Sequence, residues 1–138
     1  MERLRAYAPV VDRRQISTDR APAALGPYSQ AIVAGDLVFC SGTVGMDPGT
    51  GQVLDGIEAQ TEQALKNLAA ILEEAGSSLG DLVKTTIMYA AVDDFAVINE
   101  IYGRYMPDPA PARSAPANVA LPKGLLISID AIAVRSPR

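Results

Sequence analysis

Hydrophobic residues recur every three or four positions between residues 56 and 75, which is the period of an amphipathic α-helix. Asp55 and Glu58 resemble an N-terminal capping pair, in which side chains bond the first free N–H groups of a helix. Gly76 follows the last apolar position and is typical of the residue that ends a helix. The pattern therefore predicts one long helix over residues 56–75.

The remaining pattern predicts a second helix and several strands. Apolar residues on one side predict a helix over residues 94–105, with Asp93 as its N-cap. Short segments rich in Val, Ile and Thr predict strands at residues 16–18, 31–33, 37–41, 82–92, 112–120 and 125–134. The turn at residues 34–36 predicts a hairpin. This order predicts an α+β fold, with one mixed sheet and two helices on one face.

The last predicted strand is apolar on both of its faces. Ile127 and Ile129 lie on one face, whereas Ile132 and Val134 lie on the other. Two helices cover only one side of the sheet, so we expect the other side to contact a second copy of the chain. The sequence therefore predicts a homo-oligomer.

Composition limits the chemistry that the chain can perform. Its 138 residues fit one domain and include no histidine and one cysteine, Cys40. A Ser-His-Asp or Cys-His unit is excluded, and we expect no metal and no cofactor. Cys40 lies in an apolar run and is expected to be a buried thiol in a reducing compartment. No segment is long and apolar enough for a membrane span, so we expect a cytoplasmic protein with no membrane partner.

Charge divides the chain into two parts. Residues 1–20 carry five arginines and three acidic residues, and the net charge of −4 leaves the remaining 118 residues at −6. We assign residues 1–15 to a basic N-terminal arm and residues 16–138 to a single domain. An acidic body argues against a nucleic-acid partner, because that binding needs clustered cations.

Four segments together resemble a known family. They are Ala21-Pro22-Ala23-Ala24-Leu25-Gly26-Pro27-Tyr28-Ser29-Gln30-Ala31, Cys40-Ser41-Gly42-Thr43, Asn99-Glu100-Ile101-Tyr102, and Pro111-Ala112-Arg113-Ser114 followed by Leu121-Pro122-Lys123. In this order and at these separations they resemble the RidA (YjgF-type) family of reactive intermediate deaminases, over about residues 16–135.

The resemblance implies a chorismate mutase-like sandwich that assembles as a homotrimer with a β-barrel core and clefts between subunits. It also implies hydrolysis of enamines and imines, such as 2-aminoacrylate and 2-iminopropionate, to 2-oxo acids and ammonia. The residues that it places at the cleft are Tyr28 from the adjacent chain, Ser41, Gly42, Thr43, Asn99 and Arg113. Arg113 suits a small imino or oxo acid, because its planar N–H groups bind a carboxylate bidentately.

Two positions depart most from the family pattern, besides Thr43, which replaces the more common glutamine. Ser128 stands where members active on small imino acids commonly carry a glutamate, and Ala115 stands where they commonly carry a cysteine. Ser128 can hold a water by hydrogen bonding, but it cannot take its proton at neutral pH. We therefore expect Arg113, Ser128 and Tyr28 to act in catalysis, with Ala115 in a wall that admits a bulkier imine.

Two alternatives remain open from the sequence. The first is a non-catalytic protein that binds a small carboxylate, because Ser128 removes the usual water-positioning carboxylate. The second is RNA cleavage, which the acidic body and the absent histidines disfavour.

Overall fold

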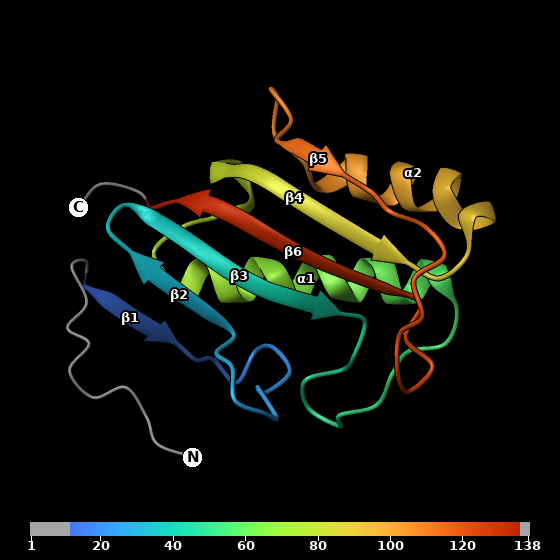
Figure 1. Ribbon diagram of the computed structural model, residues 1–138, viewed down its shortest axis with the longest axis horizontal. Coiled ribbons are helices and arrows are strands. Elements are labelled where there is room, and N and C mark those ends of the chain that lie inside the picture. The colour runs from blue at the N-terminus through green and yellow to red at the C-terminus, as the bar shows by residue number, and fades with distance from the viewer. Residues whose placement is uncertain (1–11, 136–138) are drawn as a thin grey trace, which may run out of the picture.

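The computed structural model describes residues 12–135, which form one six-stranded sheet and two α-helices (Figure 1). The strands are β1 Arg13–Ile16, β2 Ala31–Ala34, β3 Leu37–Val44, β4 Leu82–Tyr89, β5 Ala112–Ser114 and β6 Ile127–Val134. The helices are α1 Ile57–Glu74 and α2 Phe95–Tyr105, and single 3₁₀ turns cover Leu79–Asp81 and Val92–Asp94. In the part of the chain described, no helix is long and apolar enough to cross a membrane.

The sheet has the order β1-β2-β3-β6-β4-β5, so the last long strand lies in its middle. Only the β4 and β5 pair is parallel, which makes the sheet mixed. Both helices lie behind the sheet in Figure 1, and α1 contacts β3 and β6. The predicted α+β fold with two helices on one face is therefore confirmed.

Helix α1 forms the centre of the core. Leu65, Leu68 and Leu72 recur on one face of this helix and are fully buried against the sheet. The predicted capping pair at its start is wrong, because the N-cap is Gly56 at φ 87° and no side chain bonds the helix end. Gly76 follows the helix at φ 80°, a left-handed conformation that favours glycine, which confirms the predicted end.

Three other local predictions differ from the structure. Helix α2 is preceded by a 3₁₀ turn, so its N-cap is Asp94 rather than Asp93. Strand β1 begins at Arg13, inside the predicted arm, whereas residues 1–11 of that arm lie outside the described residues. Strand β5 has three residues rather than nine, because Pro116 has no N–H to donate to a ladder.

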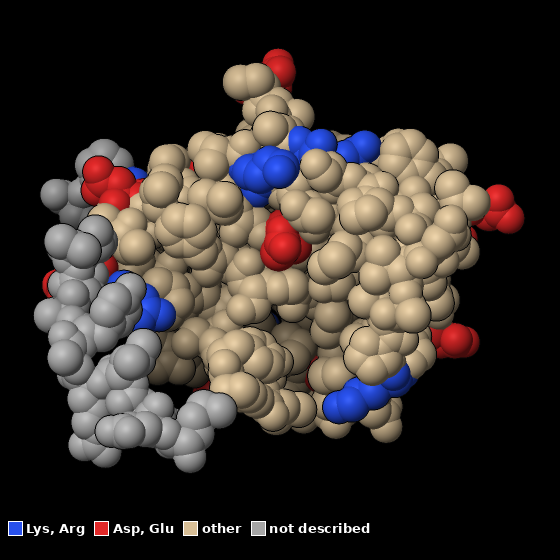
Figure 2. Space-filling view, viewed as in Figure 1, with Lys and Arg blue, Asp and Glu red and all other residues tan. Residues whose placement is uncertain are grey.

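The face of the sheet opposite the helices is largely apolar. Leu37 pairs with Val134 and Phe39 pairs with Ile132 across β3 and β6. Phe39 is 42% exposed, and Leu37 and Val134 are each 37% exposed. Figure 2 shows this face as mostly uncharged, with one acidic group near its centre and most cations toward its margins. Such a patch is typical of a surface that another protein covers.

Candidate functional site

Arg113 lies on β5, the last strand at one edge of the sheet, and its side chain is exposed. Its Nη1 donates to Asn99 Oδ1 of α2 at 2.7 Å. Among residues 12–135, no carboxylate forms an ion pair with it. Four of its five N–H groups therefore remain for an anion, and a carboxylate can accept two of them in one plane.

Gly42 and Ser128 lie next to each other on neighbouring strands. The register between β3 and β6 shifts between Cys40 and Thr43, so Gly42 sits in a β-bulge. A Cβ added to Gly42 would lie 2.5 Å from the Oγ of Ser128. Only a glycine therefore leaves the Ser128 hydroxyl in its present position, and the bulge leaves nearby backbone groups outside the ladder.

A small hollow of about 30 Å³ lies beside this bulge. Its lining residues are Pro22, Tyr28, Gln30, Gly42, Thr43, Val44 and Ile71. The Tyr28 ring is 54% exposed, and its hydroxyl accepts from the Leu25 N–H at 3.4 Å. Gln30 holds the loop before β2 in place, because its Nε2 donates to the carbonyls of Thr18, Ala21 and Pro22.

The hydroxyls of Ser41 and Thr43 serve the fold. Ser41 Oγ donates to the Ser29 carbonyl at 2.6 Å, and Thr43 Oγ1 donates to the Ser41 carbonyl at 3.0 Å. Thr43 is also buried. Both hydroxyl protons are therefore engaged within the fold, so donation of a hydrogen bond to a ligand falls to the backbone of this segment. Ala115 is half-buried and packs against the hydrophobic core.

One chain keeps Arg113 and Tyr28 apart. Ala31, which follows Tyr28 by three residues, pairs with Cys40 of β3, and Cys40 pairs with Ala131 of β6. The same row continues through Thr85 of β4 to Arg113. Four strand spacings thus separate Ala31 from Arg113, which is about 19 Å. Within a single chain the predicted site residues form two groups on different parts of the sheet.

Electrostatics near the bulge hold a proton on Cys40. Burial of the thiol, reinforced by the nearby carboxylate of Asp130, raises the pKa of Cys40 to about 12. The thiol is therefore neutral at physiological pH and is not a nucleophile. Within the described range, no three His, Cys, Asp or Glu side chains are grouped to hold a metal ion.

Three residues that lie beside Arg113 were not predicted as site residues: Phe95, Tyr102 and Thr85. Its guanidinium Cζ lies 5.1 Å from the ring centroid of Tyr102 and 5.6 Å from that of Phe95. The Tyr102 hydroxyl shares a 2.6 Å hydrogen bond with Thr85 Oγ1. Phe95, Asn99 and Tyr102 have the spacing of one helix face, which was a signal for this cluster.

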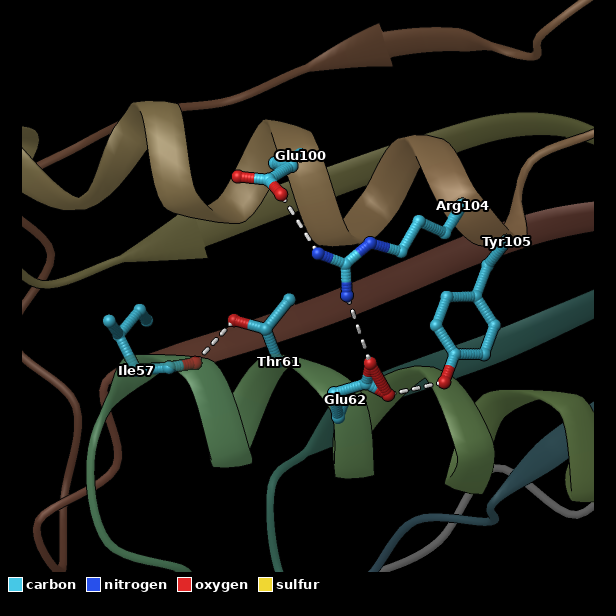
Figure 3. Close-up of polar contacts among 6 residues, drawn as sticks. All are labelled: Ile57, Thr61, Glu62, Glu100, Arg104 and Tyr105. Carbon is cyan, nitrogen blue, oxygen red and sulfur yellow. Dashed lines mark hydrogen bonds and ion pairs between the residues drawn. The ribbon is translucent and has the colours of Figure 1, made fainter.

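A second, larger hollow of about 320 Å³ lies between α1 and α2 and contains none of the predicted residues. Its charged groups bond one another: Arg104 contacts Glu62 and Glu100, and Tyr105 donates to Glu62 (Figure 3). The bond to Glu62 is the main cause that raises the pKa of Tyr105 to about 12. The two contacts with Glu62 join α2 to α1, whereas the Arg104–Glu100 pair lies within α2.

The mixed sheet, two helices and edge arginine define a small α+β protein with an exposed guanidinium at one edge of its sheet. The family model described as Endoribonuclease L-PSP matches residues 18–135. The chain therefore belongs to this family, which confirms the predicted RidA relationship, because relatives and solved structures under that name match as well.

Three relatives illustrate the similarity. The chain is 50% identical over 131 residues to Reactive Intermediate Deaminase A, chloroplastic, of Arabidopsis thaliana, covering 94% of this chain and 70% of that protein. It is 46% identical over 126 residues to the human 2-iminobutanoate/2-iminopropanoate deaminase, covering 91% and 92%. The crystal structure of RidA from Psychrobacter sp. PAMC 21119 superposes with a TM-score of 0.85 at 45% identity, covering 88% and 98%.

Proposed function

We propose that this protein hydrolyses small 2-imino acids to 2-oxo acids and ammonia. The observation that carries the proposal is Arg113, an exposed guanidinium that Asn99 orients and no carboxylate of residues 12–135 neutralises. Such a group binds a free carboxylate bidentately, and a 2-imino acid presents one beside its C=N bond. The human relative named 2-iminobutanoate/2-iminopropanoate deaminase supports the same substrate class, and the Arabidopsis relative carries the name of a reactive intermediate deaminase.

The reaction needs one water and no redox partner. The water oxygen forms a bond to C2 while the C=N double bond becomes a single bond, which gives an aminoalcohol. The C–N bond then breaks as the C2–oxygen bond becomes the new carbonyl, and the nitrogen, which has taken both protons of the water in the two steps, leaves as ammonia. A 2-imino acid and water thus yield a 2-oxo acid and ammonia, so the proposal requires neither a metal nor an organic cofactor.

The proposed site lies between two copies of a homotrimer. The separation of about 19 Å between Ala31 and Arg113 supports a shared cleft, because one chain does not bring Tyr28 to Arg113. The apolar face with Phe39 at 42% exposure supports an oligomer that covers it. In this arrangement each cleft is lined by Arg113 of one copy and by Tyr28 of its neighbour.

Catalysis at this site depends on positioning. Ser128 can orient the water, and the Gly42 bulge brings backbone donors close to it. Neither group takes a proton at neutral pH, so the site lacks the general base that is worth about 10²–10⁴-fold. Orientation of substrate and water, together with fixed amide dipoles, provides the remaining acceleration.

A trapping assay tests the proposal. A lyase generates 2-aminoacrylate from serine, and semicarbazide captures the imine that forms from it. We expect the purified protein to suppress capture and to accelerate 2-oxo acid release. Arg113→Ala should abolish this effect. Arg113→Lys should leave a weak residual activity, because a single ammonium group cannot bind a carboxylate bidentately.

Unchanged capture with a stoichiometric excess of the folded wild type would overturn the proposal. Binding of pyruvate without any ammonia release would then favour the non-catalytic alternative. RNA cleavage is the other competing activity, since the family model carries the name of an endoribonuclease. Incubation of the same preparation with single-stranded RNA distinguishes it. A cytoplasmic location stays a prediction, and the name of the Arabidopsis relative places that protein in a chloroplast.

A further inference from the structure

Arg113 is exposed, yet helix α2 holds its guanidinium from three positions. Asn99 accepts a hydrogen bond from Nη1 at 2.7 Å, and the rings of Phe95 and Tyr102 lie 5.6 and 5.1 Å from Cζ. A free arginine side chain samples many rotamers, and ordering it on binding opposes ligand capture. These three contacts restrict the side chain before a ligand arrives.

The Tyr102 ring is itself fixed by a bond inside the core. Its hydroxyl and Thr85 Oγ1 lie 2.6 Å apart, and the two residues are 5% and 0% exposed. Thr85 is also the direct ladder partner of Arg113 in the parallel β4 and β5 pair. The backbone of Arg113 and the ring beside its guanidinium are therefore both tied to Thr85.

We propose that the buried Thr85–Tyr102 hydroxyl pair is a positioning device that sets the direction in which Arg113 presents its free N–H groups. Tyr102 is a positioning residue, since it is 95% covered and acts through the guanidinium that it contacts. This inference rests on the proposed function for its biological purpose. The contacts that link Thr85, Tyr102 and Arg113 are present whether or not the protein hydrolyses imines.

Two single variants and their combination test the device. Tyr102→Phe keeps the ring and removes its hydroxyl, and Thr85→Val removes the opposite hydroxyl with little change in volume. We expect each to raise the pyruvate dissociation constant and the KM for 2-iminobutanoate about fivefold, with kcat changed less than twofold. This split follows because an anchor contributes equally to ground-state and transition-state binding. The double variant should show the same dissociation constant and KM as each single variant, since the two hydroxyls act as a unit.

Tyr105→Phe is the matched control. It makes the same change on the same helix, but the Tyr105 hydroxyl bonds Glu62 of α1 (Figure 3). We expect this variant to keep the wild-type dissociation constant and KM within twofold. A stability loss alone would affect all three variants, whereas altered ligand affinity in a folded protein identifies positioning.

Nitrogen-15 relaxation of the Arg113 Nε–H group gives a readout that needs no catalysis. We expect restricted motion of this group in the wild type and in Tyr105→Phe, and greater motion in Tyr102→Phe and Thr85→Val. Folded variants with unchanged motion and unchanged pyruvate affinity would overturn the positioning role. If the wild type neither binds pyruvate nor hydrolyses imines, the proposed function fails, while the relaxation data still decide whether the pair orders Arg113.

Discussion

Gln60 is the buried side chain whose loss should weaken the fold most clearly. It lies on α1 with 1% exposure, and its amide makes three hydrogen bonds. Nε2 donates to the carbonyls of Leu54 and Gly124 at 3.0 and 3.1 Å, and Oε1 accepts from the Leu126 N–H at 2.8 Å. One side chain thus joins α1 to the loop before it and to the turn that leads into β6.

Replacing Gln60 by Met keeps the length of the side chain and its helix propensity but removes every bond. The Leu126 N–H loses its acceptor inside the protein, which costs about 1–3 kcal/mol. The Gly124 carbonyl belongs to an exposed residue and can bond water instead, so its contribution is at the low end of about 0.5–1.5 kcal/mol. We expect the free energy of unfolding to fall by about 3 kcal/mol in total.

Lys66→Met is the control on the same helix. The Lys66 side chain is exposed, so this change should alter the free energy of unfolding by less than about 0.5 kcal/mol. Urea unfolding followed by circular dichroism, at one protein concentration because assembly adds to stability, measures both losses. Equal losses in the two variants, or a loss under about 1 kcal/mol for Gln60→Met, would refute the assigned role.

Two further predictions concern the β3 and β6 region. Ser128→Glu should raise kcat for 2-iminopropanoate by at least about tenfold, because a carboxylate there can take a proton from water, and steady-state kinetics checks this. The pKa of Cys40, about 12 in the fold, exceeds the value of roughly 8.5 in an unfolded chain, so the fold keeps a proton that the unfolded chain releases. The free energy of unfolding should therefore fall between about pH 9 and 12, by at most about 1.4 kcal/mol per pH unit. Cys40→Ala should make the urea midpoint less dependent on pH over this range.

The fold was largely predictable because local patterns determine most of it. The apolar period placed α1 within one residue at each end, and Gly35 at φ 60° forms the predicted hairpin turn. Helix starts were less predictable, since the N-cap of α1 is Gly56, which has no side chain to bond the first N–H groups. Strand β5 ends before Pro116, which has no N–H to donate, and beyond it the Val119 N–H bonds the Tyr89 carbonyl outside the regular ladder.

The site was less predictable than the fold. Its named residues came from motifs, but their grouping depends on strand order, and β6 is inserted between β3 and β4. That insertion, which no local pattern reveals, separates Tyr28 from Arg113. Tyr102 lies at an apolar position of α2 and is buried, yet its ring also contacts the guanidinium. One residue can satisfy both roles, so periodicity alone does not separate them.

A mixed-assembly experiment tests most directly whether imines are hydrolysed in a cleft shared by two copies. Arg113→Ala and Tyr28→Ala are each expected to lose at least about tenfold in activity, and equal amounts are then unfolded together and refolded. In a cyclic trimer, about one quarter of the sites combine an intact Arg113 with an intact Tyr28 from the next copy. We predict recovery of about a quarter of the wild-type 2-iminobutanoate deaminase activity. Activity no higher than the average of the two separate variants would contradict the shared site.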